Sequence, residues 1–304
     1  MATTNYPFGF AGGVSLRGVP LAMTVPGKVW WVSSVIGSDG NNGKTKEKPF
    51  ATIDYAIGRC TDDKGDVIFV MPNHAETLAT AGAITADVIG VSVIGLGNGK
   101  QTPRLSLSAT GSTIAVSAAN VTFKNLIVNA GVAEVGQAFA VTGADCTLDG
   151  IRSYPVSTYS IESFVRTTSG GIDLVVKNCD LMQTTAPTAA SIFIQLVAST
   201  RARIMDNIIY ATLKNDAACT VVGGSGTAST GVIISNNQLV MVGGTTQLSV
   251  VLMYSGSTGL MSNNSLAATL TTLAGMNNPA NLWCNENYCT KAVAKHGIID
   301  PTVS

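Results

Sequence analysis

The stretch VIISNNQL at residues 232–239 decides the fold, because close copies of it recur along the chain. In each copy a short β-prone run ends in Asn or a small residue, and a second run follows. The copies are VTFKNLIV (121–128), CTLDGIR (146–152), LVVKNCDL (174–181), RIMDNIIY (203–210), GLMSNNSL (259–266), LWCNENYC (282–289) and a weaker VSVIG (91–95). The turn positions are 95, 125, 150, 178, 207, 236, 263 and 286. A repeat of roughly 20–50 residues indicates a solenoid.

Two kinds of solenoid have this period. A leucine-rich repeat needs an apolar residue five positions before the Asn. That column instead holds residues typical of turns, namely Asn120, Asp145, Asp173, Ala202, Gly231, Thr258 and Asn281. Another β-prone run lies upstream in most copies, as at 139–141 and 192–197. Each repeat therefore predicts one coil of a right-handed, single-stranded parallel β-helix, an all-β fold of about eight coils.

Stacking of coils about 4.8 Å apart places equivalent residues in columns. Asn tolerates the left-handed backbone conformation, and stacked amides can hydrogen-bond along the axis. We therefore expect an Asn ladder of Asn125, Asn178, Asn207, Asn236 and Asn263. The column two before the turn is apolar and is expected to face inward: Phe123, Leu148, Val176, Met205, Ile234, Met261 and Cys284.

The neighbouring columns are expected to face outward. The column one before the turn alternates in charge through Lys124, Asp149, Lys177 and Asp206, which predicts an ion-pair ladder. The column three before the turn becomes apolar along the chain, and an exposed apolar stripe marks a contact surface. We expect a subunit interface, most simply in a homotrimer with parallel axes, formed by Val175, Ile204, Ile233, Leu260 and Trp283. The alternative is that the chain's own loops cover this stripe.

The N-terminal third follows a different pattern. Residues 1–28 are Gly-rich without a sustained period, which predicts an extended arm. Strands at 28–33 and 66–72 and a short helix at 49–58 form a cap over residues 29–80, at the open end of a β-helix body spanning 29–290. Residues 291–304 remain as a C-terminal tail.

The amino-acid composition argues against several classes of function. Of 304 residues, 46% are hydrophobic and only 12% are charged, with 18 basic and 18 acidic side chains. A zero net charge argues against a nucleic-acid partner and against binding to a membrane surface. Neither a membrane-spanning apolar run nor a secretory signal is expected from the sequence. A chain this apolar and this weakly charged is expected to be covered by other chains.

Few residues are candidates for catalysis or for metal binding. Asp149 and Asp206 share a predicted column two coils apart, but Lys177 between them favours an ion-pair ladder over catalysis. The loop at 38–43 has one carboxylate, which favours a turn over a calcium site. His74 is expected to anchor a loop. None of the six cysteines forms a CxxC pair, so the sequence does not predict a zinc site. A disulfide between Cys284 and Cys289 is left as an open alternative. We expect no cofactor and no catalytic residue.

The segments VWWVSSVIGSDGNNG (29–43), KPFATIDYAI (48–57) and GDVIFVMPNHAETL (65–78) resemble the opening of pectate-lyase-like parallel β-helix domains. The preceding segment at 5–32 resembles N-termini of tailed-bacteriophage virion proteins. The resemblance implies a capsid decoration protein or a tail spike. An arm that binds the major capsid protein or another virion protein would then use Tyr6, Phe8, Phe10, Leu16 and Arg17.

The sequence thus predicts a structural, non-enzymatic virion protein whose partners are its own copies and the capsid. Two alternatives stay open. One is a tail-spike depolymerase, a polysaccharide lyase or glycosidase. The other is a non-catalytic receptor-binding protein.

Overall fold

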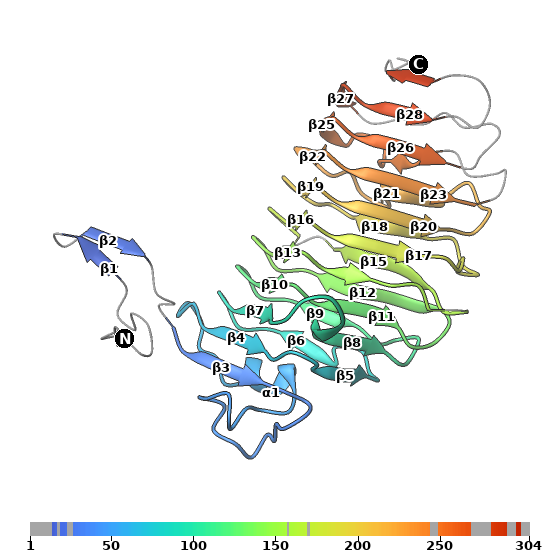
Figure 1. Cartoon of the computed structure of the whole chain (residues 1–304). Helices are drawn as coiled ribbons and strands as arrows, with labels where there is room; N and C mark the ends of the chain where they lie inside the picture. Colours follow the sequence, from blue (N-terminus) through green and yellow to red (C-terminus); the bar gives the residue numbers. More distant parts are fainter. Residues whose placement is uncertain are drawn as a thin grey trace, which may run out of the picture.

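The computed structural model describes residues 14–16, 19–22, 27–156, 158–168, 171–243, 249–268, 281–290 and 296–298. Over this range the chain winds into a parallel β-solenoid, in which successive coils lie one upon another (Figure 1). Three sheets line its sides, with ten, ten and seven strands. The predicted all-β solenoid is confirmed, with seven coils that carry all three strands against the eight expected.

Sheet 1 takes the strand before the Asn turn of each coil. Its members are β3 (Val29–Val32), β4 (Val67–Val70), β7 (Ser92–Gly95), β10 (Thr122–Lys124), β13 (Thr147–Asp149), β16 (Val175–Lys177), β19 (Arg203–Met205), β22 (Val232–Ser235), β25 (Thr258–Ser262) and β27 (Asn281–Asn285).

Sheet 2 takes the strand after the turn. Its members are β5 (Ala75–Leu78), β8 (Arg104–Leu107), β11 (Ile127–Ala130), β14 (Arg152–Ser153), β17 (Asp180–Gln183), β20 (Ile208–Thr212), β23 (Gln238–Val242), β26 (Ser265–Ala268), β28 (Tyr288–Thr290) and β29 (His296–Ile298). Strand β29 lies in the predicted tail and pairs antiparallel with β28, at the end of the sheet.

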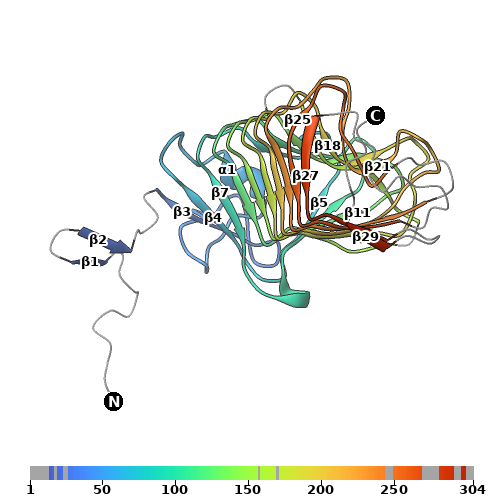
Figure 2. The same cartoon turned by 90° about the horizontal axis from the view of Figure 1, so that it is seen from above.

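Sheet 3 closes each coil. Its members are β6 (Ile84–Ala86), β9 (Ile114–Val116), β12 (Val135–Val141), β15 (Ile161–Thr167), β18 (Ile192–Leu196), β21 (Thr220–Gly224) and β24 (Val251–Leu252). The three sheets enclose the core, and Figure 2 shows the coils superposed in a view from above.

Left-handed residues turn the chain between sheets 1 and 2. Asn125, Asn178, Asn236 and Asn263 have φ between 53° and 57°, as expected from the sequence. Gly150 and Glu286 are also left-handed. The predicted turns at Asn207 and Gly95 are wrong, because the left-handed residues are Asp206 and Gly97. A second left-handed column lies five residues earlier, at Asn120, Asp145, Asp173, Arg201 and Gly231.

The Asn ladder exists, but it runs one position after the turn. Asn207, Asn237, Asn264 and Asn287 are buried, and each of the first three donates from Nδ2 to Oδ1 of the next at 2.8–2.9 Å. Each Nδ2 also donates to a backbone carbonyl of the preceding coil, as Asn237 does to Ile204 at 2.8 Å. Of the five predicted ladder residues only Asn207 belongs to it. Because every amide is satisfied, these polar side chains can occupy a core position.

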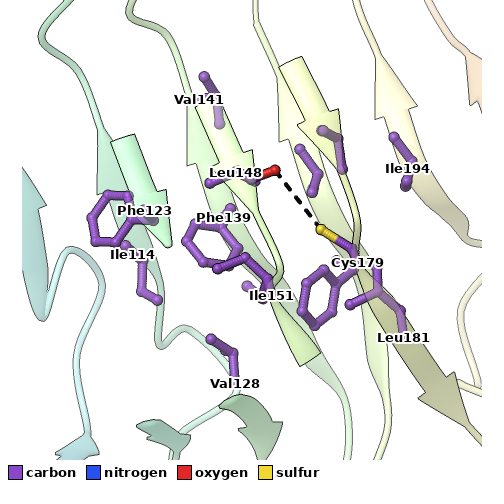
Figure 3. Close-up of a cluster of buried hydrophobic side chains, with 14 of the residues drawn as sticks. Ile114, Phe123, Val128, Phe139, Val141, Leu148, Ile151, Cys179, Leu181 and Ile194 are labelled. Atoms are coloured by element: carbon purple, nitrogen blue, oxygen red, sulfur yellow. Dashed lines mark hydrogen bonds between the residues drawn. The ribbon is translucent and has the colours of Figure 1, made fainter. Parts of the chain in front are cut away.

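Apolar residues fill the same column in earlier coils, at Leu126, Ile151 and Cys179. Beside it, Phe123, Phe139, Phe164 and Phe193 stack along the axis with ring centroids 5.6–6.0 Å apart. Figure 3 shows part of this core, including the hydrogen bond from Cys179 Sγ to the Leu148 carbonyl at 3.8 Å. The described part of the core combines an aromatic stack with a ladder of paired amides.

The N-terminal cap forms as predicted around α1 (Ile53–Ile57). Its buried Ile53, Ala56 and Ile57 belong to the hydrophobic core, which shields the first coil. A single 3₁₀ turn lies at Gly99–Gln101. In the arm, β1 (Val14–Leu16) and β2 (Val19–Ala22) pair as an antiparallel hairpin that joins none of the three sheets.

The ladder supports a stability prediction. Replacement of Asn237 by Ala removes the acceptor for the Asn207 amides and the donor for the Ile204 carbonyl. Each buried polar group left without a partner costs about 1–3 kcal/mol. We expect Asn237→Ala to lower the thermal midpoint by several degrees or more in a calorimetric scan. Gln238→Ala, at the exposed neighbouring position, is the control; equal loss in both variants would contradict a special role for the ladder.

Candidate functional site

The outer face of sheet 1 carries the predicted interface column. Strand register aligns Val175, Arg203, Ile233, Leu260 and Trp283 in five successive coils. Val175 and Ile233 are half-buried, whereas Leu260 is 39% exposed and Trp283 is 82% exposed. The apolar stripe is therefore real at its C-terminal end and is interrupted by an arginine.

The placement of Ile204 in this column is wrong. Ile204 is fully buried and aligns with the inward residues Val176 and Ile234. The error follows from the turn position, because a turn at Asp206 moves every residue of β19 by one place. In a strand, a shift by one residue moves each side chain to the opposite face. Met205, predicted to face inward, lies instead in the outward column beside Lys177.

A second exposed apolar group lies on sheet 2. Met182, Ile208 and Tyr288 are 37%, 51% and 55% exposed. Ile208 and Tyr288 share one outward column, separated by Gln238 and Ser265. This group was not predicted from the sequence, although strand alternation indicates it. Successive residues of a strand point to opposite faces, so Ile208 faces outward because its neighbour Ile209 is buried, as is Ala211.

The charge ladder on sheet 1 is shorter than predicted. Lys124 Nζ lies 3.2 Å from Asp149 Oδ2, and Asn178 Nδ2 donates to Asp149 Oδ1 at 2.8 Å. Burial alone would raise the pKa of Asp149, but these bonds and the charge of Lys177 outweigh it and hold the pKa below its usual value. Asp206 is a turn residue outside this column, so the expected alignment of Asp149 with Asp206 is wrong.

A second charged group lies beside the apolar stripe. Arg201 donates from Nε to Asp173 Oδ1 at 2.8 Å, and Arg203 lies 3.7 Å from the same oxygen. These are surface contacts, which solvent and salt screen strongly. They occupy the coil in which the apolar stripe is interrupted.

A groove of about 320 Å³ opens on sheet 3 across β15, β18 and β21. Its polar lining residues are Glu162, Ser163, Arg166, Ser191, Gln195 and Ser225, and its apolar lining residues are Ala190, Ile192 and Ala218. Strand register places Arg166 beside Gln195, and the Ser163 hydroxyl donates to the Ile192 carbonyl at 2.8 Å. No repeat signal marks these residues in the sequence, because several of them come from loops of variable length.

Glu162 lies within β15 and lines this groove, whereas Glu134 lies in the turn before β12. Burial and the charge of Glu134 raise the pKa of Glu162, against the lowering effect of Arg166. The Glu134 carboxylate is hydrogen-bonded within the chain, because the Thr188 N–H and hydroxyl both donate to it at 3.0 Å.

The remaining candidates are structural in the described geometry. Asp39, in the loop at 38–43, accepts hydrogen bonds from the N–H groups of Ala51 and Thr52. His74 is buried; it accepts from the Ser34 N–H at Nδ1, and its Nε2 lies 3.0 Å from Glu76. The carboxylate thus closes a turn and the histidine anchors a loop, as expected.

Several predicted features lie beyond the described geometry. Tyr6, Phe8, Phe10 and Arg17 of the arm, and the Cys289 side chain, lie outside the described residues. Leu16 is the last residue of β1. Within the described ranges no three His, Cys, Asp or Glu side chains gather as a metal site. No described helix has the length and hydropathy to cross a membrane.

The fold has counterparts among solved structures. A rhamnogalacturonan lyase superposes with a TM-score of 0.45 and 12% sequence identity, over 85% of this chain and 87% of that chain. A GH136 lacto-N-biosidase from Eubacterium ramulus gives a TM-score of 0.37 at 12% identity, over 87% and 68%. The sequence matches no protein-family model and no curated protein. These likenesses concern the fold alone. The three sheets of coil-to-coil parallel strands define this chain as a parallel β-solenoid protein.

The sheet 1 ion pair supports a pH prediction. A depressed pKa means that Asp149 adds stability above its unfolded pKa, near 3.9, and that this stability is lost as pH falls through the folded pKa. We expect Lys124→Met to raise the pKa of Asp149 towards its usual value, as followed by carboxyl NMR titration. Lys46→Met, at an exposed lysine far from Asp149, is the control. An unchanged titration in Lys124→Met would contradict the ion pair.

Proposed function

We propose that this protein is a structural, self-associating β-solenoid of the tailed-bacteriophage virion that decorates the capsid. The supporting observation is the row of exposed apolar side chains at the C-terminal end of sheet 1. Leu260 and Trp283 are neighbours in adjacent coils and expose 39% and 82% of their surface. A contiguous exposed apolar surface of this kind marks a contact site for another chain.

Association through this row has a clear driving force. Burial of apolar surface contributes about 25 cal/mol per Å², and a tryptophan at the centre of an interface is often one of its strongest contributors. Copies with parallel axes would bring the same coils together, so that Leu260 and Trp283 meet their equivalents. We propose the homotrimer as the simplest closed assembly that does this.

The rigid body suits a passive building block. Parallel strands pair coil to coil along all three sheets, and the Asn ladder satisfies buried amides inside the core. Such a body keeps its outer columns in fixed positions, and Cys60, Cys146, Cys179 and Cys219 are free thiols within it.

The link to the virion rests on the N-terminal segment. Residues 5–32 resemble the N-termini of phage virion proteins, and the β1–β2 hairpin within them belongs to none of the three solenoid sheets. A segment outside the sheets is available to bind another surface. We propose that residues 1–28 bind the major capsid protein or another virion protein.

The depolymerase alternative has one supporting observation, the raised pKa of Glu162 beside the sheet 3 groove. An acid with a raised pKa is a candidate proton donor. A glycosidase also needs a second carboxyl group, and Glu134 is engaged by Thr188. Turnover of a bacterial surface polysaccharide by the purified protein, abolished in Glu162→Gln, would favour this alternative over a structural role.

The proposed interface predicts a change in assembly. We expect the double variant Leu260→Ser/Trp283→Ser to shift the full-length protein from oligomer to monomer in light scattering coupled to size exclusion. Burial of both side chains drives association, and serine removes it. Val35→Ser, at a residue 68% exposed in the cap, is the matched control and stays oligomeric. A folded double variant that remains oligomeric would refute this interface.

Attachment through the arm can be tested separately, by deleting it. We expect a protein that lacks residues 1–26 to keep its oligomeric state and its thermal midpoint. The hairpin contributes to none of the three sheets, and Lys28, which is hydrogen-bonded to Asp66 and Val67, is retained. It is expected to be missing from virions isolated by density gradient and probed by immunoblot. Normal incorporation of the truncated protein would contradict attachment through the arm.

A further inference from the structure

The groove on sheet 3 lies outside the proposed interface and is a candidate site for a small molecule. It holds about 320 Å³, which lies at the lower end of the range for small-molecule sites. Its lining comes from three successive coils, so its shape is set by the rigid stacking of β15, β18 and β21.

The groove carries one charge of each sign. Glu162 and Arg166 both belong to β15 and both line it. Four residues of strand separate their backbones by about 13 Å. Arg166 acts on Glu162 through space, yet no ion pair within 4.0 Å joins these two described side chains. Each charged group thus remains available to a ligand.

Strand register places Ile192 level with the interval between the two charges, whereas Ala190 and Ala218 line the groove near its Glu162 end. No aromatic ring is among the lining residues, so the groove offers no face for a stacked sugar or base. The arrangement is therefore two opposite charges with an aliphatic side chain, Ile192, between them.

Hydrogen bonds hold the walls in place before any ligand binds. Gln195 Nε2 donates to Ser225 Oγ at 2.5 Å, and the Ser163 hydroxyl donates to the Ile192 carbonyl at 2.8 Å. Glu134 fixes Thr188, which lies two residues before Ala190 in the groove wall. A site whose walls are already ordered loses little entropy when a ligand binds.

We propose that this groove binds a small zwitterion whose carboxylate and ammonium groups are separated by a short aliphatic segment. The carboxylate pairs with the Arg166 guanidinium, a planar donor that matches its two oxygens. The ammonium group pairs with Glu162, whose charged form is otherwise destabilised by burial and by Glu134. The aliphatic segment lies over Ile192. The site is independent of the proposed interface, which lies on sheet 1.

The probe is 6-aminohexanoate, compared with hexanoate and hexylamine, which each keep one of its two charges. Saturation-transfer NMR with the intact oligomer reports binding and gives dissociation constants by titration. We expect 6-aminohexanoate to bind about tenfold more tightly than either analogue, a difference of about 1.4 kcal/mol, because each analogue lacks one of the two charged contacts.

Variants assign the two ends of the ligand. In Arg166→Gln the affinity for 6-aminohexanoate falls to that of hexylamine, and in Glu162→Gln it falls to that of hexanoate. Lys124→Gln, at a cation on sheet 1 outside the groove, is the matched control and binds as the parent does. Equal binding of all three probes, binding unaffected by both groove variants, or no binding would each overturn the proposal. None of these results bears on the oligomeric state.

Discussion

The parallel hydrogen bonding of each coil to the next is the constraint on which this structure depends. It sets the separation of coils and so forces equivalent residues into columns along the axis. A column inside the core must then be either apolar or fully paired. The position after the Asn turn shows both solutions, with Leu126 and Ile151 in early coils and Asn207 and Asn237 in later ones.

The same constraint shapes the outer surface. Equivalent residues of successive coils lie side by side, so like residues in consecutive coils form a continuous patch. On sheet 1 one outward column pairs Lys124 with Asp149, and another places Leu260 beside Trp283. One rigid face therefore carries both a charged pair and an exposed apolar row.

The repeat was enough to predict the solenoid and most of its turns, because period and alternation are local properties. It failed where two adjacent residues both suit a left-handed turn. At Asp206-Asn207 the turn was predicted at the Asn, which placed Ile204 on the wrong face. The constant spacing of five between the two left-handed columns places the turn at Asp206, since Arg201 is the left-handed residue before it.

The sequence by itself determined the coil, its period and the inward or outward direction of most strand residues, because strand alternation is set by the backbone. Only the tertiary structure decided the groove on sheet 3. Glu162 and Arg166 share a strand, but Gln195 and the Thr188 that Glu134 holds come from the next coil and its loop. Loops of unequal length carry no period, so what they bring together depends on how the coils stack.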